Sequence, residues 1–191
     1  MIEAVDAMIA RGGAYAPRWG WHDHHRAADG TAAYLPALQQ VRIEYAAFLE
    51  DLRDAGTFNG KCLQLGLGEC QASHDAWDTL FYWGAVSIDL GRSLAGRDAF
   101  PGHNTHDEAA RAFAAERGPY TMLFVDAGHL EPDVAADHRD YAALVRPGGV
   151  VAFHDALERQ GFAIDVHRYI ASLQGVRVIG SEVGIAWIQQ S

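Results

Sequence analysis

Residues 63–73 read LQLGLGECQAS, and two glycines in this stretch, Gly66 and Gly68, separate an apolar run from a helix-like one. Glycines at a strand–helix turn let a ligand approach the backbone, and the helix N-terminus beyond them offers unpaired N–H groups. Asp89 ends the next apolar run, 21 residues after Gly68. At that distance an acidic side chain can accept hydrogen bonds from the hydroxyls of a nucleotide ribose. The pattern favours a nucleoside site over its alternative, a tight turn that binds nothing.

Short apolar runs alternate with helix-length stretches along most of the chain. The expected strands cover residues 62–66, 85–89, 121–126 and 149–153, and the expected helices cover residues 72–83, 105–117, 132–144 and 156–173. Strands that are almost wholly apolar are typical of a parallel sheet buried on both faces. We therefore expect an α/β fold, a Rossmann-like, mostly parallel sheet with helices on both faces. Topology requires one more strand between residues 89 and 105, where no strand pattern is visible.

The two ends of the chain depart from this alternation. Residues 176–179 and 184–188 flank a Gly-Ser-Glu turn, which predicts a C-terminal antiparallel β-hairpin at one edge of the sheet. The N-terminal part is predicted to hold helices over residues 2–11 and 35–55, joined by the aromatic, histidine-rich loop AYAPRWGWHDHHRAADG. We expect residues 1–57 to form a helical arm or lid, which covers the active site or builds a homodimer, and residues 58–191 to form the main domain.

Composition narrows the classes of function. The chain has 191 residues and a net charge of −10, which disfavours a large nucleic-acid interface because phosphates require clustered Lys and Arg. No apolar run approaches the ~18 residues of a membrane span, and the N-terminus has no signal-peptide pattern. The expected location is the cytoplasm, without membrane contact.

A second group of polar residues follows the later strands. Asp126 and Asp155 each end an expected strand, so their carboxylates share one rim with the glycine turn if the two strands are adjacent. Oxygen-rich sites of this kind suit Mg²⁺ or Mn²⁺. His154 either adds an imidazole ligand, which favours Mn²⁺, Fe²⁺ or Zn²⁺, or turns into the packing face of the sheet. An unperturbed imidazole titrates near neutral pH, and His129 is either a general base or a loop histidine that caps the next helix.

These motifs together resemble a known family. The segments that carry the likeness are LQLGLGECQASH (63–74), SIDL (87–90), LFVDAGHLEPDVAADHRDYAALVRPGGVVAFHD (123–155) and the closing hairpin. They resemble class I S-adenosylmethionine-dependent methyltransferases. Within that superfamily the chain is most similar to small bacterial metal-dependent O-methyltransferases of sugars and natural products, and to their cephalosporin-hydroxylase-like relatives.

The resemblance implies a role for each site residue. Its implied cofactor-binding residues are Gly66, Gly68 and Ser73 for the methionine moiety, Asp89 for the ribose, Leu90 for the adenine, and Asp126. Its implied metal ligands are Asp126, His154 and Asp155, and its implied general base is His129. The chain departs from the family at Gln64, where an acidic residue is usual, and at Ala72, where a glycine is usual. These departures leave the contact to the amino group of the cofactor open.

The expected activity is metal-assisted methyl transfer from S-adenosylmethionine to a hydroxyl of a small molecule. The main alternative is a non-catalytic nucleoside-binding or scaffold protein that kept the fold. A nicotinamide oxidoreductase is disfavoured because Gln71 stands where a third glycine is required. Two further expectations concern helices. His74, at the start of one helix, either touches the cofactor carboxylate or packs without a contact to it. Asp133, Asp137 and Asp140 are expected to form a solvated helix face.

Overall fold

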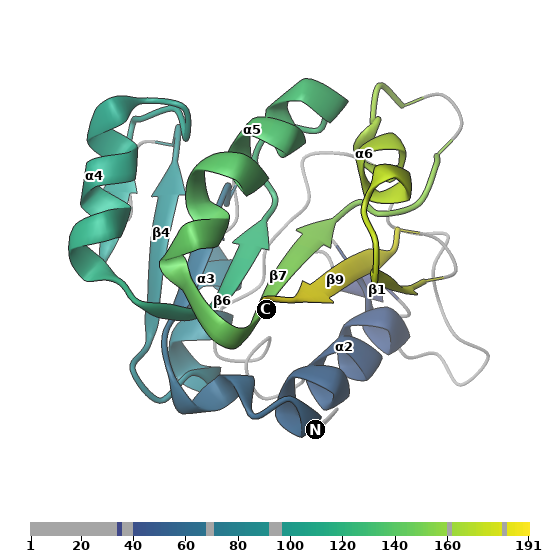
Figure 1. Ribbon diagram of the computed structural model, residues 1–191, viewed down its shortest axis with the longest axis horizontal. Coiled ribbons are helices and arrows are strands. Elements are labelled where there is room, and N and C mark those ends of the chain that lie inside the picture. The colour runs from purple at the N-terminus through teal and green to yellow at the C-terminus, as the bar shows by residue number, and fades with distance from the viewer. Residues whose placement is uncertain (1–33, 36–39, 68–70, 92–96, 160–161, 181–182) are drawn as a thin grey trace.

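The computed structural model describes residues 34–35, 40–67, 71–91, 97–159, 162–180 and 183–191. Seven strands form one sheet in the order β5-β4-β3-β6-β7-β9-β8 (Figure 1). The strands are β3 (Cys62–Leu65), β4 (Ala85–Asp89), β5 (Ala99–Pro101), β6 (Tyr120–Val125), β7 (Val145–His154), β8 (Arg177–Ile179) and β9 (Ile185–Gln189). Strands β3 to β7 run parallel, whereas β9 pairs antiparallel with both β7 and β8. The predicted parallel sheet and C-terminal antiparallel hairpin are confirmed.

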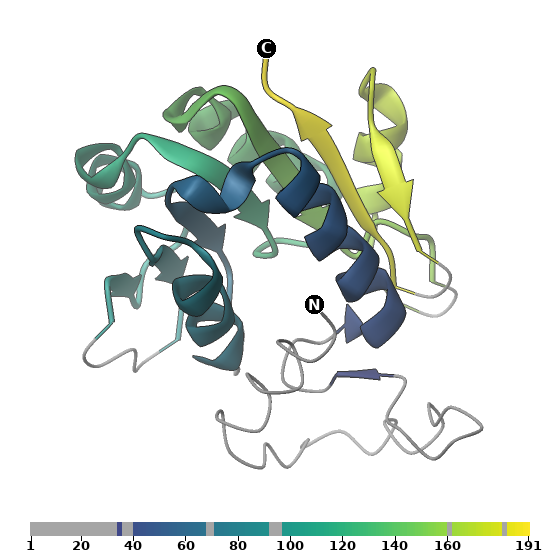
Figure 2. The same cartoon turned by 90° about the horizontal axis from the view of Figure 1, so that it is seen from below.

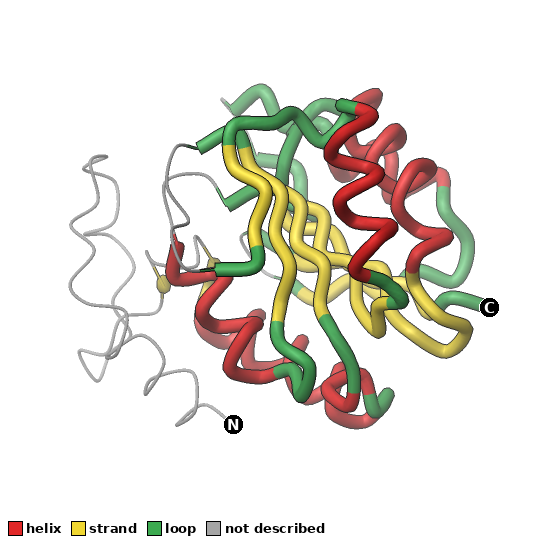
Figure 3. Tube along the Cα trace, turned by 90° about the vertical axis from the view of Figure 1, so that its left-hand side faces the viewer, coloured by secondary structure: helices red, strands yellow, loops and turns green. Residues whose placement is uncertain are grey.

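Helices cover both faces of this sheet, as expected (Figure 3). They are α2 (Arg42–Asp54), α3 (Gln71–Leu80), α4 (Glu108–Arg117), α5 (Glu131–Tyr141) and α6 (Val166–Ser172), with the 3₁₀ turns η3 (Thr57–Asn59) and η4 (Ala142–Leu144). Alternate residues of β6 point to opposite faces. Leu123 packs among residues of α4, α5 and α6, whereas Phe124 packs among residues of α2 and α3. No helix in the described ranges is long and apolar enough to cross a membrane.

Helix α2 contributes to the core beneath one face of the sheet (Figure 2). Its side chains Tyr45, Phe48, Leu49 and Leu52 are almost completely buried, at the spacing of one apolar helix face. Phe48 meets the ring of Trp77 edge-on at a centroid distance of 6.4 Å. Although α2 precedes residue 57, it is therefore packed into the core of the main sheet, while the division into two domains at residue 57 stays a prediction.

The helix predicted over residues 35–55 is wrong in its first part. Leu35 lies in strand β1 (Tyr34–Leu35), which pairs antiparallel with β2 (Gln40–Val41), and α2 begins only at Arg42. Leu35 is followed by Pro36 in the sequence, and a residue before proline is disfavoured in helical conformation. The expected helix 2–11 and the histidine-rich loop lie outside the described residues.

The helix predicted over residues 156–173 is likewise much shorter, because only Val166–Ser172 is helical. The N–H groups of Ala156 and Leu157 donate instead to the carbonyls of Gly184 and Val183. Because these N–H groups bind the segment before β9, residues 156–157 do not start a helix. The strand that topology required before residue 105 exists as β5, a three-residue edge strand paired with β4.

Candidate functional site

The strand order arranges the predicted site residues along the carboxyl edge of the sheet. The glycine turn follows β3, Asp89 ends β4, Asp126 follows β6, and Asp155 follows β7. Strands β6 and β7 are neighbours, so the condition for a shared rim is met. A pocket of about 610 Å³ runs along this edge. Its walls come from the turn after β3, residues 88–91, the loop of residues 103–106 after β5, and residues 126–129 with Asp133.

Gly66 is required by the backbone itself. Its φ angle is +82°, and a Cβ atom built at this position would lie 2.0 Å from the carbonyl oxygen of Asp126. The close approach follows from main-chain pairing, because the Gly66 N–H donates to Ile88 and the Asp126 N–H donates to Leu65. Gly66 therefore lets the turn pass directly against the loop that carries Asp126. Gly68, the second glycine of the motif, lies outside the described residues.

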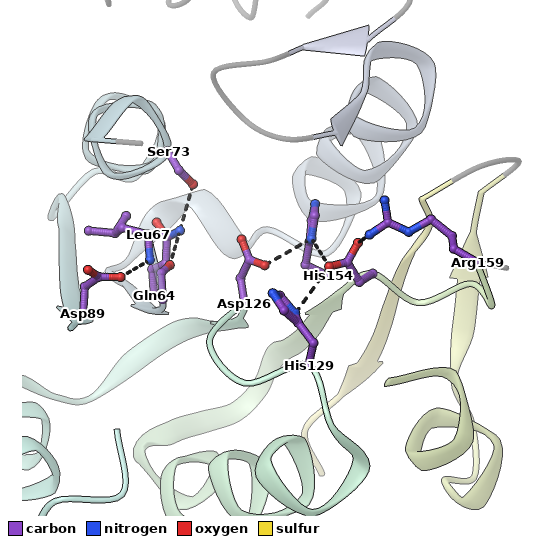
Figure 4. Close-up of polar contacts among 10 residues, drawn as sticks. Gln64, Leu67, Ser73, Asp89, Asp126, His129, His154 and Arg159 are labelled. Carbon is purple, nitrogen blue, oxygen red and sulfur yellow. Dashed lines mark hydrogen bonds and ion pairs between the residues drawn. The ribbon is translucent and has the colours of Figure 1, made fainter. Parts of the chain in front are cut away.

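Asp89 is held beneath the pocket by two backbone amides. Its Oδ2 accepts from the Leu67 N–H at 2.6 Å (Figure 4). Its Oδ1 accepts from the Gly91 N–H. The carboxylate thus joins the glycine turn to the end of β4. Leu90 lines the same pocket and is 69% exposed. Contacts of Asp89 with ribose and of Leu90 with adenine stay predictions.

Gln64 connects β3 to the start of α3. Its Nε2 donates to Ser73 Oγ at 2.8 Å and to the Gly66 carbonyl at 2.9 Å. A carboxylate at this position could not donate either hydrogen bond. The amide of Gln64, which replaces the acidic residue usual in the family, therefore has a structural role here. Ser73 is consequently held beside the turn where the methionine moiety was predicted. His74 lies away from the pocket, buried with its Nδ1 2.7 Å from Ser87 Oγ.

Asp126, His154 and Asp155 form one cluster. Ligand-type atoms of all three lie within 4.8 Å of one another. The Nδ1 atom of His154 lies 3.1 Å from an Asp126 oxygen and 3.5 Å from an Asp155 oxygen (Figure 4). His154 is buried, yet neither ring nitrogen makes a hydrogen bond of normal geometry within the described ranges. The imidazole of His154 therefore faces the two carboxylates, and packing against the sheet is not its only contact.

Asp155 is also contacted by two side chains from other parts of the rim. His129 lines the pocket, and its Nδ1 lies 3.4 Å from Asp155 Oδ2. Arg159 forms an ion pair with Asp155 Oδ1, a contact that sequence reasoning missed although the spacing of four residues was visible. Asp155 has a φ angle of +54°, which is uncommon for a residue with a side chain. The carbonyl of His129 accepts from the Asp165 N–H at 2.8 Å, which ties the two loops together.

The charges of this cluster reinforce one another. Burial alone would raise the pKa of Asp155, but His154, Arg159 and His129 outweigh burial and hold the pKa at about 2. Burial would lower the pKa of His154, but the carboxylates of Asp126 and Asp155 raise this pKa well above its usual range. The cluster therefore keeps the Asp155 carboxylate ionised, and the proton of His154 balances its charge. A metal ion that used His154 as a ligand would have to displace this proton.

The doubly wound sheet carries a glycine turn after β3, an acidic residue at the end of β4 and a polar cluster at the ends of β6 and β7. This arrangement is typical of α/β folds that bind ligands at the carboxyl edge of the sheet. A family profile described as "Methyltransferase domain" matches residues 22–156. The chain belongs to this methyltransferase-domain family, which confirms the resemblance drawn from the sequence. A search of curated protein sequences finds no match.

Solved structures share the fold at low sequence identity. The methyltransferase MycE of the mycinamycin biosynthetic pathway, in complex with Mg, SAH and mycinamycin VI, is 17% identical with a TM-score of 0.60, over 76% of this chain and 49% of that one. A caffeoyl-CoA O-methyltransferase-like protein from Staphylococcus aureus is 11% identical with a TM-score of 0.58, over 80% and 85% of the chains. CalS11, a TDP-rhamnose 3'-O-methyltransferase of calicheamicin biosynthesis, is 12% identical with a TM-score of 0.55, over 80% and 81%. The chain spans about half the length of MycE.

Proposed function

We propose that this protein transfers a methyl group from S-adenosylmethionine to a hydroxyl oxygen of a small molecule, with help from a divalent metal ion. The observation that carries the proposal is the order of residues along one pocket. Asp89 stands at the β4 end for a ribose, and His129 stands near the β6 and β7 ends with the acidic cluster. A cofactor bound along this edge would direct its sulfonium towards His129.

The residues at the β7 end fit a divalent cation. Two carboxylates and one imidazole offer ligand atoms within 4.8 Å of one another, and neither imidazole nitrogen of buried His154 makes a hydrogen bond of normal geometry with a described residue. Asp126, His154 and Asp155 would hold the ion, with Mn²⁺ preferred over Mg²⁺ because of the imidazole. When bound, such an ion lowers the pKa of a hydroxyl that it coordinates.

His129 would act as the general base. Its side chain is 43% exposed and lines the pocket, and its Nδ1 lies 3.4 Å from the buried carboxylate of Asp155. A carboxylate beside one ring nitrogen orients an imidazole and stabilises its protonated form. His129 would take the proton of the acceptor hydroxyl as the oxygen bonds to the methyl carbon, while the carbon–sulfur bond breaks to leave the neutral thioether.

A small natural product or sugar is the acceptor class that we favour. The MycE structure contains mycinamycin VI, and CalS11 is described as acting on TDP-rhamnose. The net charge of −10 disfavours nucleic acid as the acceptor. We also propose that the N-terminal arm covers the pocket or joins two copies into a homodimer, as its aromatic residues suggest.

The decisive experiment is calorimetric titration of the purified protein with S-adenosylhomocysteine, with and without Mn²⁺ or Mg²⁺. Binding, followed by methyl transfer to members of a panel of hydroxyl compounds, is the expected result. Binding without any metal-stimulated transfer would favour the alternative, a non-catalytic nucleoside-binding protein. Absence of binding would refute the proposal at its first step.

A further inference from the structure

A second buried carboxylate stands behind the opposite end of the pocket, outside the cluster described above. The expectation of a solvated face on α5 is wrong for Asp137, which is completely buried. Its Oδ1 lies 3.4 Å from Nε2 of His106. No hydrogen bond of normal geometry reaches either carboxylate oxygen from the described residues, and Nε2 of His106 is equally buried and unpartnered. Burial raises the pKa of Asp137 and the neighbouring Thr105 side chain opposes this rise, but a buried carboxylate without a cation beside it is still costly, so its burial against a pocket histidine calls for a reason.

His106 belongs to the wall of the pocket. Its side chain is 36% exposed although Nε2 is buried, so the exposed surface comes from other atoms of the side chain. The loop that carries it is clamped from two helices. The Tyr141 hydroxyl donates to the Thr105 carbonyl at 2.5 Å, and Arg111 Nη1 donates to the His106 carbonyl at 2.5 Å. The backbone of His106 is therefore fixed, and Asp137 acts on its ring.

The strand order indicates which part of a bound nucleoside would lie at the His106 end of the pocket. Along the edge of the sheet the loop after β5 comes first, then Asp89 at the end of β4, and then the turn after β3 and the Asp126 loop. If Asp89 holds the ribose and the sulfonium points towards His129, the base lies on the other side of Asp89. That side is formed by Leu90 and residues 103–106.

We propose that Asp137 is a positioning residue that holds His106 in the tautomer whose pocket-side nitrogen accepts a hydrogen bond from the exocyclic amine of adenine. This inference rests on the proposed function. An ionised carboxylate can only accept, so a neutral imidazole beside it carries its proton on Nε2. In that neutral tautomer Nδ1 is an acceptor, which matches the 6-amino group of adenine and opposes the 6-oxo group of hypoxanthine.

The charges around Asp137 are compatible with this role at neutral pH. Burial raises the pKa of Asp137 to about 6, with Asp133 and Asp140 adding to the rise and the neighbouring Thr105 and His106 opposing it. Arg111, the nearest cation on α4, is directed to Asp140, with 3.5 Å between Nη1 and Oδ2. Above pH 6 the carboxylate is therefore mainly ionised and faces one imidazole.

The test compares two probes that differ only at the base, S-adenosylhomocysteine and its hypoxanthine analogue, S-inosylhomocysteine. Calorimetry at pH 7.5, a pH chosen because Asp137 is ionised there, should show the wild-type chain binding the adenine form about tenfold more tightly, the scale of one hydrogen bond. Asp137→Asn and His106→Phe should bring the ratio of the two Kd values close to one. Glu131→Gln, an exposed change on the same helix, should keep the wild-type ratio. In turnover, Asp137→Asn should raise KM for S-adenosylmethionine and leave kcat nearly unchanged.

The outcomes separate this inference from the function on which it rests. Failure of the wild-type chain to bind S-adenosylhomocysteine would overturn the proposed function. A wild-type chain that binds both probes equally, or folded variants that keep the wild-type ratio, would overturn the role of Asp137 and His106 alone. Because His106 is partly exposed, His106→Phe keeps the test valid even if Asp137→Asn does not fold, with circular dichroism as the check.

Discussion

Asp155 and Asp137 stand behind opposite ends of one pocket, and each lies 3.4 Å from a histidine that lines it, His129 and His106 respectively. Both carboxylates are buried, but their surroundings differ. Asp155 faces two imidazoles and a guanidinium, and its pKa is about 2. Asp137 faces one imidazole with acidic neighbours on its own helix, and its pKa rises to about 6. The end of the pocket near Asp155 is therefore strongly charged, which would suit a cation and a proton transfer. The end near Asp137 is weakly charged, which would suit an uncharged base.

The largest expected effect is at the charged end. His129→Ala should lower kcat by about 10²–10⁴-fold, the usual contribution of a general base. The deficit should shrink at high pH, where the acceptor hydroxyl ionises without help. A pH series of kcat for both proteins measures this, with the exposed change Glu131→Gln as the control. Wild-type kcat of His129→Ala at neutral pH would remove the assigned base.

The second-largest expected effect is on metal affinity, which should differ between variants of Asp155 and Asp137. Asp155→Asn should weaken Mn²⁺ binding by at least about 100-fold, because loss of a ligand exceeds the 10–100-fold cost of losing an outer-shell partner. Asp137→Asn should bind Mn²⁺ as the wild-type chain does. Titration calorimetry measures the Kd for Mn²⁺ of both variants. In a second experiment, chelation of the metal with EDTA should stop turnover while S-adenosylhomocysteine still binds. Full turnover in EDTA would contradict the metal role.

Asp89 lies between the two ends, and its loss should affect the cofactor as a whole. Asp89→Ala should weaken S-adenosylhomocysteine binding by about 1.5–3 kcal/mol, the scale of hydrogen bonds to a charged group. Unlike Asp137→Asn, it should weaken the adenine and hypoxanthine forms equally. A comparison of Kd values for the two probes checks both statements, and unchanged affinity would remove the ribose assignment.

The smallest effect concerns stability, and its sign distinguishes Asp137. A carboxyl whose pKa is raised from 3.8 to about 6 on folding binds protons more tightly in the folded chain. The free energy of unfolding therefore decreases as the pH rises from about 4 to about 6, and stays lower above that window. Asp137→Asn removes this penalty, which is about 3 kcal/mol for a shift of this size, and should stabilise the chain at pH 7 by the part that desolvation of the amide does not offset. Urea unfolding at pH 7 and pH 4 measures the gain, which should vanish at pH 4, whereas a loss of stability at pH 7 would contradict the raised pKa.

The sequence alone determined where the main strands lie and which residues end them. A parallel strand buried on both faces must be apolar until it leaves the sheet, so Asp89, Asp126 and Asp155 marked the ends of β4, β6 and β7. The glycine turn was visible for a similar local reason, since Gly66 adopts a conformation that side chains disfavour. Because carboxyl ends of parallel strands share one edge, their meeting around a single pocket could also be inferred.

Only the tertiary structure decided which other side chains contact the residues at the carboxyl edge of the sheet. Arg159 reaches Asp155 from a segment that was expected to be helical, and the segment is not helical because its N–H groups pair with residues before β9. Asp137 occupies a sequence position that resembles a solvated face, and it is buried because the clamped loop after β5 covers α5. Such contacts join residues distant in the chain, and local periodicity contains no information about which distant element will cover a helix face.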